Sequence, residues 1–216
     1  MIAVVLFARS PEREAAAKRI AGAAPLFRKV IAAWLREAEA AGARPVIACE
    51  ARDRAALAAI APEVAREWIE QPRASFGERV FSATTEAFGR GFERVVLAAI
   101  DAPPLRLREA LDVLASGVPV VGPARDGGIN FIGVLNADYA LLSNLTVARC
   151  LEALPDAVVF EAATDVDSTA SLAIARIEKA WRGYFVGRPR FIEPFVARAL
   201  CGVVHPHASR PPPSAG

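Results

Sequence analysis

The first segment that could do chemistry is residues 8–13, which follows an apolar run and is followed by Lys18 and Arg19. Arg9, directly after the run, and Lys18 or Arg19 would suit phosphate oxygens, because cationic side chains form charge-assisted hydrogen bonds and a guanidinium group can bind in a bidentate fashion. The alternative is that Arg13, Lys18 and Arg19 belong to the solvated face of a helix. The sequence therefore predicts a phosphate-binding loop, with Arg9 as its strongest candidate.

Three aspartates are candidate metal ligands. Asp101 follows the apolar run 95–99 and precedes two prolines, a place where a carboxylate could bind a hard divalent cation. Asp165 and Asp167 are two residues apart, so an extended segment puts both on one side, where they could share a cation or keep one another partly protonated. Helix capping is the competing interpretation. Asp101 could cap the helix that follows it, and Asp167 or Ser168 could cap the helix predicted from residue 168. Capping by Ser168 and metal binding could both hold.

A third candidate is the run Asp126, Gly127 and Gly128. Consecutive glycines let a backbone pass close to a ligand, because no β-carbon intervenes. A tight Asp-Gly hairpin turn is the alternative, and the local sequence alone favours that turn.

Secondary-structure elements must hold these residues in position. Along the chain, short apolar runs alternate with longer alanine-rich amphipathic ones. That alternation predicts an α/β fold with a mostly parallel sheet and helices on both faces. Ligands bind such sheets outside the carboxyl ends of the strands. We expect strands over residues 2–7, 45–49, 95–99 and 118–121, and a further one over 129–135. We expect helices over residues 26–41, 54–61, 77–88, 107–115 and 168–179.

The composition fits one compact domain, predicted to span residues 1–204, with a disordered Pro-rich tail over 205–216. The chain has 216 residues, of which 54% are hydrophobic and 23% charged, and a formal net charge of +2. These values argue against a disordered protein and against an electrostatic nucleic-acid binder. No apolar run approaches the ~20 residues of a membrane span. The aromatic stretch from Trp181 to Phe195 is expected to pack back on the domain, the alternative being a contact in a homodimer.

Several well-known catalytic, nucleotide-binding and metal-binding motifs are absent from the sequence. The three cysteines are far apart and form no CxxC pair, so we expect neither a disulfide framework nor a thiolate zinc site, and a cytoplasmic location. The start of the chain lacks the pattern of a secretory signal. There is no GxGxxG after the first strand, no P-loop, no GxSxG and no HExxH. Both histidines, His205 and His207, lie at the start of the predicted tail, which argues against histidine-based catalysis.

Taken in order, these segments resemble the DUF2064 group of the nucleotide-diphospho-sugar transferase superfamily, over roughly residues 1–180. The family pattern contains Arg-x-Pro, Lys-Thr-Arg-Leu, a Gln followed by Leu-Gly-Glu-Arg, Gly-Ser-Asp-x-Pro-Asp-Leu, Pro-Ala-x-Asp-Gly-Gly-Tyr-Tyr-Leu-Ile-Gly and Asp-x-Asp-Thr. The matching residues here are Arg9-Ser10-Pro11, Ala17-Lys18-Arg19-Ile20, Gln71 with Phe76-Gly77-Glu78-Arg79, Ala99 to Leu105, Pro123 to Gly133, and Asp165 to Ser168.

The resemblance implies a Rossmann-like GT-A fold and a metal-dependent transferase that moves a nucleotidyl or glycosyl group to a small acceptor. A nucleoside triphosphate or nucleotide sugar would contact five residues: Arg9, Lys18, Arg19, Gly77 and Arg79. Mg²⁺ or Mn²⁺ would be held by Asp101, Asp165 and Asp167, with Asp101 and Asp126 in catalytic roles. Gly127, Gly128 and Asn130 would lie beside the acceptor or sugar. No membrane or nucleic-acid partner is implied.

The departures from the family pattern support a second hypothesis. Ala17 stands where the family run has lysine, although Lys18 is adjacent, and Pro104 stands in place of the second aspartate of the Asp-x-Pro-Asp signature. Ile129 and Asn130 replace its paired tyrosines. The alternative function is therefore a non-catalytic relative that binds a nucleotide or a protein partner.

Overall fold

The computed structural model describes residues 1–176, 178 and 181, which belong to one compact unit. The predicted domain end at residue 204 and the predicted tail lie outside the described residues, as do His205, His207 and Cys201. Within the described part of the chain, no helix is long and apolar enough to cross a bilayer.

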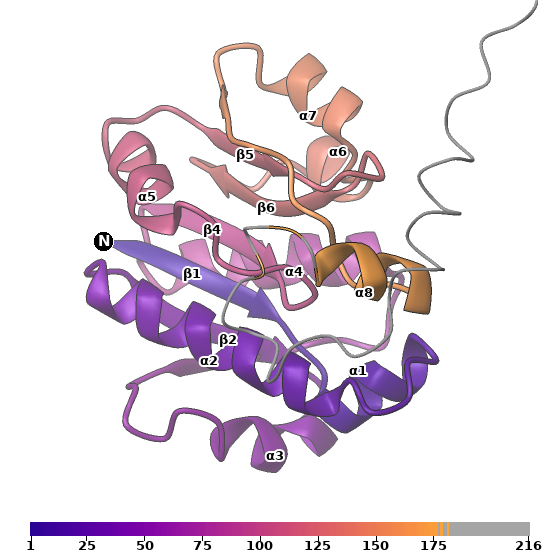
Figure 1. Cartoon of the computed structure of the whole chain (residues 1–216). Coiled ribbons are helices and arrows are strands. Elements are labelled where there is room, and N and C mark those ends of the chain that lie inside the picture. Colours follow the sequence, from indigo (N-terminus) through magenta and orange to yellow (C-terminus); the bar gives the residue numbers. More distant parts are fainter. Residues whose placement is uncertain (177, 179–180, 182–216) are drawn as a thin grey trace, which may run out of the picture. The chain divides into compact units, whose positions relative to one another are not determined.

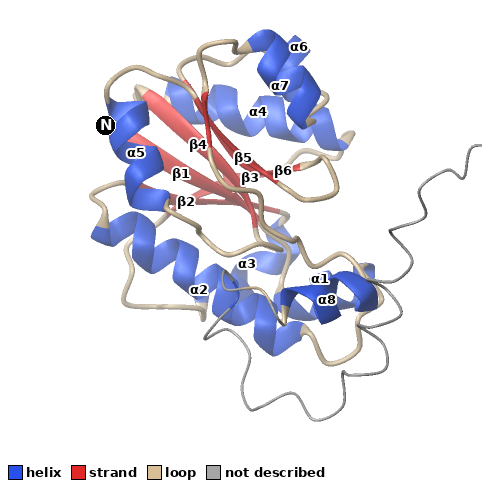
Figure 2. Ribbon diagram, turned by 45° about the horizontal axis from the view of Figure 1, so that its top comes forward, coloured by secondary structure: helices blue, strands red, loops and turns tan. Residues whose placement is uncertain are grey.

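A seven-stranded, mostly parallel sheet forms the centre of the fold, in the order β3-β2-β1-β4-β6-β5-β7 (Figures 1 and 2). Its strands are β1 (Ile2–Phe7), β2 (Arg44–Cys49), β3 (Glu67–Glu70), β4 (Arg94–Ala99), β5 (Val120–Pro123), β6 (Ile129–Val134) and β7 (Val158–Val159). β6 is antiparallel to its neighbours β4 and β5, and the other pairs are parallel. The α/β class and the mostly parallel sheet are thus confirmed.

Helices cover both faces of the sheet (Figure 2). In β1, Val4 and Leu6 face one buried cluster, which includes side chains of α2 and α5, while Ala3 and Val5 face a second one with side chains of α4. This alternation explains why strand β1 reads as continuously apolar. The helices are α1 (Pro11–Ala17), α2 (Ala24–Ala40), α3 (Arg54–Ala58), α4 (Phe76–Gly89), α5 (Leu107–Ala115), α6 (Tyr139–Leu142), α7 (Val147–Ala153) and α8 (Thr169–Ala175), with a 3₁₀ turn, η1, at Ala51–Asp53.

The structure adds elements that the sequence pattern did not predict. Strand β3 has the sequence Glu-Trp-Ile-Glu and lies at the sheet edge, so only Ile69 is buried and no apolar run marks it. Strand β7 has two residues, and α6 and α7 are short, which explains why the chain after residue 135 shows no clear period. Strand β5 begins two residues later than predicted, at Val120.

Candidate active site

Asp101 lies just beyond the carboxyl end of β4, and the chain then turns toward α5. The helix cap of α5 is Arg106, in a left-handed conformation with φ of 51°, so Asp101 does not cap that helix. The Asp101 carboxylate is therefore available for a role other than helix capping. One of its oxygens, Oδ1, is buried and has no hydrogen-bond partner among the described residues.

The segment that carries Asp165 and Asp167 runs beside Asp101. The backbone N–H of Val166 donates to the carbonyl oxygen of Asp101 at 2.9 Å, and the Val166 side chain is fully buried. Because neighbouring side chains alternate on an extended segment, Asp165 and Asp167 project to the other side. Ser168 caps α8 through a reciprocal pair of bonds with Ser171, so the predicted capping by Ser168 is confirmed, and metal binding by Asp165 and Asp167 stays a prediction.

One carboxylate oxygen from each of Asp101, Asp165 and Asp167 lies within 4.8 Å of the other two. The structure thus brings together the three aspartates that the sequence singled out as metal ligands. Three hard oxygen donors, one of them carrying a buried oxygen without a partner, match the preference of Mg²⁺ and Mn²⁺ for carboxylates. The chemistry of these donors therefore fits a divalent cation.

Lys18 is the cation that two of these carboxylates, Asp101 and Asp167, contact in the structure. Its Nζ lies 2.6 Å from Oδ2 of Asp101, forms an ion pair with Asp167 and is 3.6 Å from Oε1 of Glu14. Only 11% of the side chain is exposed. Burial alone would lower the pKa of Lys18, but the charges and hydrogen bonds of Asp101 and Asp167 raise it above its ordinary value, so the side chain is an ammonium.

The two aspartates of the Asp-x-Asp pair differ in acidity. Burial, followed by the hydrogen bond and charge of Asp167 and the charges of Asp101 and Asp126, raises the pKa of Asp165 to about 7. Burial also disfavours ionisation of Asp167, but the hydrogen bond and charge of Lys18 hold the pKa of that carboxyl below its usual range. Asp165 is therefore the carboxyl of this pair that stays protonated most easily.

Glu14 is a member of this cluster that sequence reasoning missed. It is 7% exposed and contacts two cations: Lys18 through Oε1, and Arg9, whose Nη1 lies 3.3 Å from Oε2. The signal was present in the sequence, because Glu14 and Lys18 are four residues apart and so lie on one face of α1 and its end. Glu14 thus holds two of the predicted phosphate-binding side chains, Arg9 and Lys18, in one place.

A groove runs along the carboxyl ends of the first strands, next to Asp101. A small pocket of about 140 Å³ is lined by Arg9, Phe76, Arg79 and Asp101, among others. It shares Gln71 and Arg79 with a pocket of about 570 Å³ at the ends of β2 and β3. The Arg79 guanidinium donates to Oε1 of Gln71 at 2.9 Å, and its Nε is buried without a partner among the described residues.

Two residues of the predicted nucleotide site, Arg19 and Gly77, are not among the residues that line these two pockets. Arg19 is exposed, has φ of 56° and makes no side-chain hydrogen bond or ion pair with the described residues. Gly77 packs against α6: a β-carbon there would lie 2.4 Å from the carbonyl oxygen of Ser143. Close packing of α4 on α6 is therefore a sufficient reason for a glycine at this position.

The segment around Asp126 forms a turn between the antiparallel strands β5 and β6, as the local sequence favours. Gly127 has φ of 95°, and the N–H of Gly128 donates to Oδ1 of Asp126 at 2.8 Å. Asn130 is buried, and its Nδ2 donates to the carbonyl oxygens of Pro123 and Ala163. Asn130 thus fixes the turn to the segment that leads to Asp165, while the charge of Asp126 reaches Asp165.

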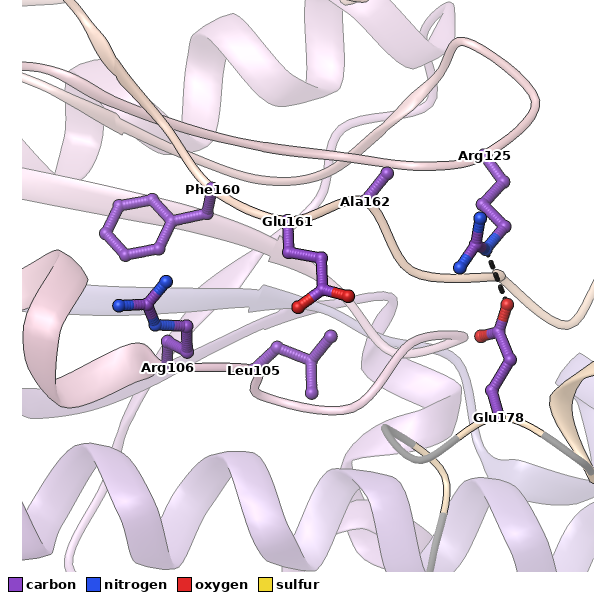
Figure 3. Close-up of a pocket in the computed structure, with 7 residues that line it drawn as sticks. All are labelled: Leu105, Arg106, Arg125, Phe160, Glu161, Ala162 and Glu178. Atoms are coloured by element: carbon purple, nitrogen blue, oxygen red, sulfur yellow. Dashed lines mark hydrogen bonds and ion pairs between the residues drawn. The ribbon is translucent and has the colours of Figure 1, made fainter.

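A further pocket, of about 580 Å³, is lined by residues 105–106 and 160–162 together with Arg125 and Glu178 (Figure 3). Arg125 Nε is 2.5 Å from Oε1 of Glu178. The Arg106 guanidinium lies 5.5 Å from the ring centroid of Phe160 and pairs with Glu109. Each guanidinium already has a carboxylate partner within the protein, and we assign this pocket no ligand.

The sequence matches one protein-family model, described as "Uncharacterized protein conserved in bacteria (DUF2064)", over residues 34–165. The chain belongs to the DUF2064 family. The match covers β2 to β7 and includes Asp101, Asp126 and Asp165, whereas Arg9, Lys18 and Asp167 lie outside it. None of the curated proteins compared with this DUF2064 protein matches it.

Solved structures share its fold. A "putative nucleotide-diphospho-sugar transferase" from Desulfovibrio desulfuricans G20 is 21% identical, with a TM-score of 0.65 over 84% of this chain and 90% of the other. A 4-diphosphocytidyl-2C-methyl-D-erythritol synthase from Anaerococcus prevotii is 10% identical, with a TM-score of 0.53 over 81% and 95% of the two chains. At these identities the similarity establishes the Rossmann-like fold of this DUF2064 protein.

Proposed function

We propose that this DUF2064 protein is a metal-dependent transferase that uses a nucleotide donor and moves a nucleotidyl or glycosyl group to a small acceptor. The observation that carries the proposal is the cluster of Asp101, Asp165 and Asp167 within 4.8 Å, at the end of a groove that also contains Arg9 and Arg79. Carboxylates beside arginines in one groove suit a donor whose phosphates bridge a metal ion and cationic side chains.

In this proposal the nucleotide lies across the carboxyl ends of the first strands. Arg9 and Lys18 bind its phosphate oxygens, and Arg79 lines the connection to the pocket at the ends of β2 and β3. The three aspartates would hold Mg²⁺ or Mn²⁺, which neutralises charge on a diphosphate leaving group. Asp126, at the neighbouring turn, would orient acceptor hydroxyls.

This chemistry depends on positioning and electrostatics rather than on a covalent nucleophile. The described cysteines agree with that requirement, because burial raises the pKa of both Cys49 and Cys150 to about 11. Both thiols stay protonated near neutral pH and are inert as nucleophiles.

Calorimetric titration with a panel of nucleoside triphosphates and nucleotide sugars, with and without Mg²⁺, tests the proposal. We expect one donor class to bind only with Mg²⁺, and Asp101→Asn to weaken that binding by at least about tenfold, equivalent to 1.4 kcal/mol. Asp112→Asn, an exposed aspartate on α5, is the matched control and leaves binding unchanged. Release of pyrophosphate on adding acceptors would indicate nucleotidyl transfer, and release of a nucleoside diphosphate would indicate glycosyl transfer.

Two results would contradict the proposal. If nucleotides bind equally well without metal, the aspartates have no metal role, and the non-catalytic alternative is favoured. If no nucleotide or nucleotide sugar binds, the groove has a different ligand. The presence of Asp165 and Asp167 beside Asp101 favours the enzyme, because three carboxylates lie together although Pro104 stands in place of the second aspartate of the Asp-x-Pro-Asp signature.

A further inference from the structure

Lys18 contacts the same carboxylates that would hold the metal ion. Its ammonium lies 2.6 Å from Oδ2 of Asp101 and is paired with Asp167, two of the three residues of the carboxylate cluster. Only 11% of its side chain and 18% of the Asp101 side chain are exposed, so the contact between these two residues is largely buried, whereas the Asp167 side chain is half exposed. One cation already neutralises part of this cluster.

A divalent ion entering beside Lys18 would meet a positive charge a few ångströms away. Two like charges at that distance in a partly buried site repel each other strongly, since the effective dielectric constant is far below that of water. Lys18 and the metal would also compete for the same oxygens of Asp101 and Asp167. Metal entry is therefore opposed unless the ammonium acquires a different partner.

Glu14 is a carboxylate that could pair with Lys18 in place of Asp101 and Asp167. It is buried, lies 3.6 Å from Lys18 Nζ through one oxygen, and holds Arg9 through the other. If the ammonium of Lys18 moved away from Asp101 and Asp167, its ion pair with Glu14 would hold it beside Arg9, next to the groove proposed to bind the phosphates. Anionic phosphate oxygens there would replace the carboxylates that Lys18 gives up.

We propose that Lys18 is a resident counter-cation that couples metal binding to nucleotide binding: it competes with a divalent ion for Asp101 and Asp167, and the phosphates of the donor relieve that competition. This inference rests on the proposed function, because it assumes that metal and phosphates share the site. It implies that metal alone binds weakly and that metal and polyphosphate strengthen each other's binding by the same factor.

Mn²⁺ binding without nucleotide, followed by water-proton relaxation, measures the competition directly. We expect Lys18→Met to bind Mn²⁺ at least about tenfold more tightly than the unaltered protein, within the usual range of coupling between sites. Lys18→Arg keeps the charge and should bind Mn²⁺ as weakly as the unaltered protein. Lys29→Met, on α2 and without an ion pair among the described residues, is the matched control. Circular dichroism establishes that each variant is folded.

Inorganic tripolyphosphate, titrated with and without Mn²⁺, measures the coupling. We expect Mn²⁺ to strengthen tripolyphosphate binding in the unaltered protein and in Lys29→Met, and this gain to shrink in Lys18→Met. Tight Mn²⁺ binding that is equal in the unaltered protein and Lys18→Met would overturn the inference while leaving the metal site intact. Failure of every variant to bind Mn²⁺, with or without tripolyphosphate, would overturn the proposed function as well.

Discussion

At the scale of single residues, the carboxylate cluster has more negative charge than Lys18 neutralises. The effect of this excess charge is seen at Asp165, because burial and its acidic neighbours raise its pKa to about 7. A carboxyl whose pKa is raised in the folded state ionises first in the unfolded chain, so it lowers stability progressively between its ordinary and its raised pKa. In the absence of metal, the contribution of Asp165 to stability is therefore fully present below its ordinary pKa of 3.8, falls as the pH rises above that value, and is lost once the pH has passed about 7.

Asp165→Asn should remove this pH dependence, because asparagine is neutral at every pH in the range. With a chelator present, we expect the variant to be more stable than the unaltered protein at pH 8 by on the order of 1 kcal/mol, a value reduced for the partial exposure of the group. Near pH 4, where the carboxyl is protonated, the difference should vanish. Urea unfolding at the two pH values measures it, and an equal difference at both would contradict the assignment.

At the scale of elements, α4 contains two glycines with different surroundings. Near the start of α4, a β-carbon at Gly77 would lie 2.4 Å from the carbonyl oxygen of Ser143. That oxygen belongs to the backbone, so it cannot move away by a rotamer change as a side-chain atom could. Gly89, at the end of α4, has nothing within 4 Å of the corresponding position. The first glycine is thus required by the contact of α4 with α6, whereas the second is open to substitution.

Gly77→Ala should lower the free energy of unfolding by about 1–3 kcal/mol, the usual cost of overpacking. Gly89→Ala, in the same helix, should leave it unchanged or raise it by up to about 1 kcal/mol, because alanine is the better helix former. Thermal unfolding of both variants provides the comparison. Equal stability of the two would show that the chain accommodates a side chain between α4 and α6.

At the scale of the whole molecule, the segment 160–167 depends on parts of the chain far apart in sequence. Phe160 bonds to Val121 at its start, and Val166 bonds to Asp101 near its end. In between, Asn130 donates to Ala163, and the indole N–H of Trp181 donates to the carbonyl oxygen of Thr164 at 2.8 Å. Trp181 is 1% exposed and packs back on the domain as predicted, while Tyr184, Phe185, Phe191 and Phe195 lie outside the described residues.

Trp181→Ala should therefore destabilise the domain by about 3–5 kcal/mol, because it removes a large buried ring. Trp181→Phe keeps most of that packing and loses the bond to Thr164, so a cost of about 1 kcal/mol is expected. Urea unfolding followed by far-UV circular dichroism measures both changes. An unchanged midpoint for Trp181→Ala would mean that the Trp181 side chain does not stabilise the fold.

The sequence by itself determined the buried strands and the positions of the aspartates. Apolar runs marked β1, β2 and β4 to within a residue, and the two-residue spacing of Asp165 and Asp167 put both on one side of an extended segment. These features are local, since burial on both faces dictates an apolar strand and backbone geometry dictates the alternation. The exposed edge strand β3 lacked that local signal.

Only the tertiary structure decided which side chains meet. It placed Lys18 between Asp101 and Asp167, residues 83 and 149 positions away, and it gave Glu14 a position beside both Arg9 and Lys18. It also assigned Asn130 and Gly77 to packing and backbone contacts. Local periodicity fixes the face on which a side chain lies, but its partner depends on which distant segment packs against that face, and sequence spacing does not specify that choice.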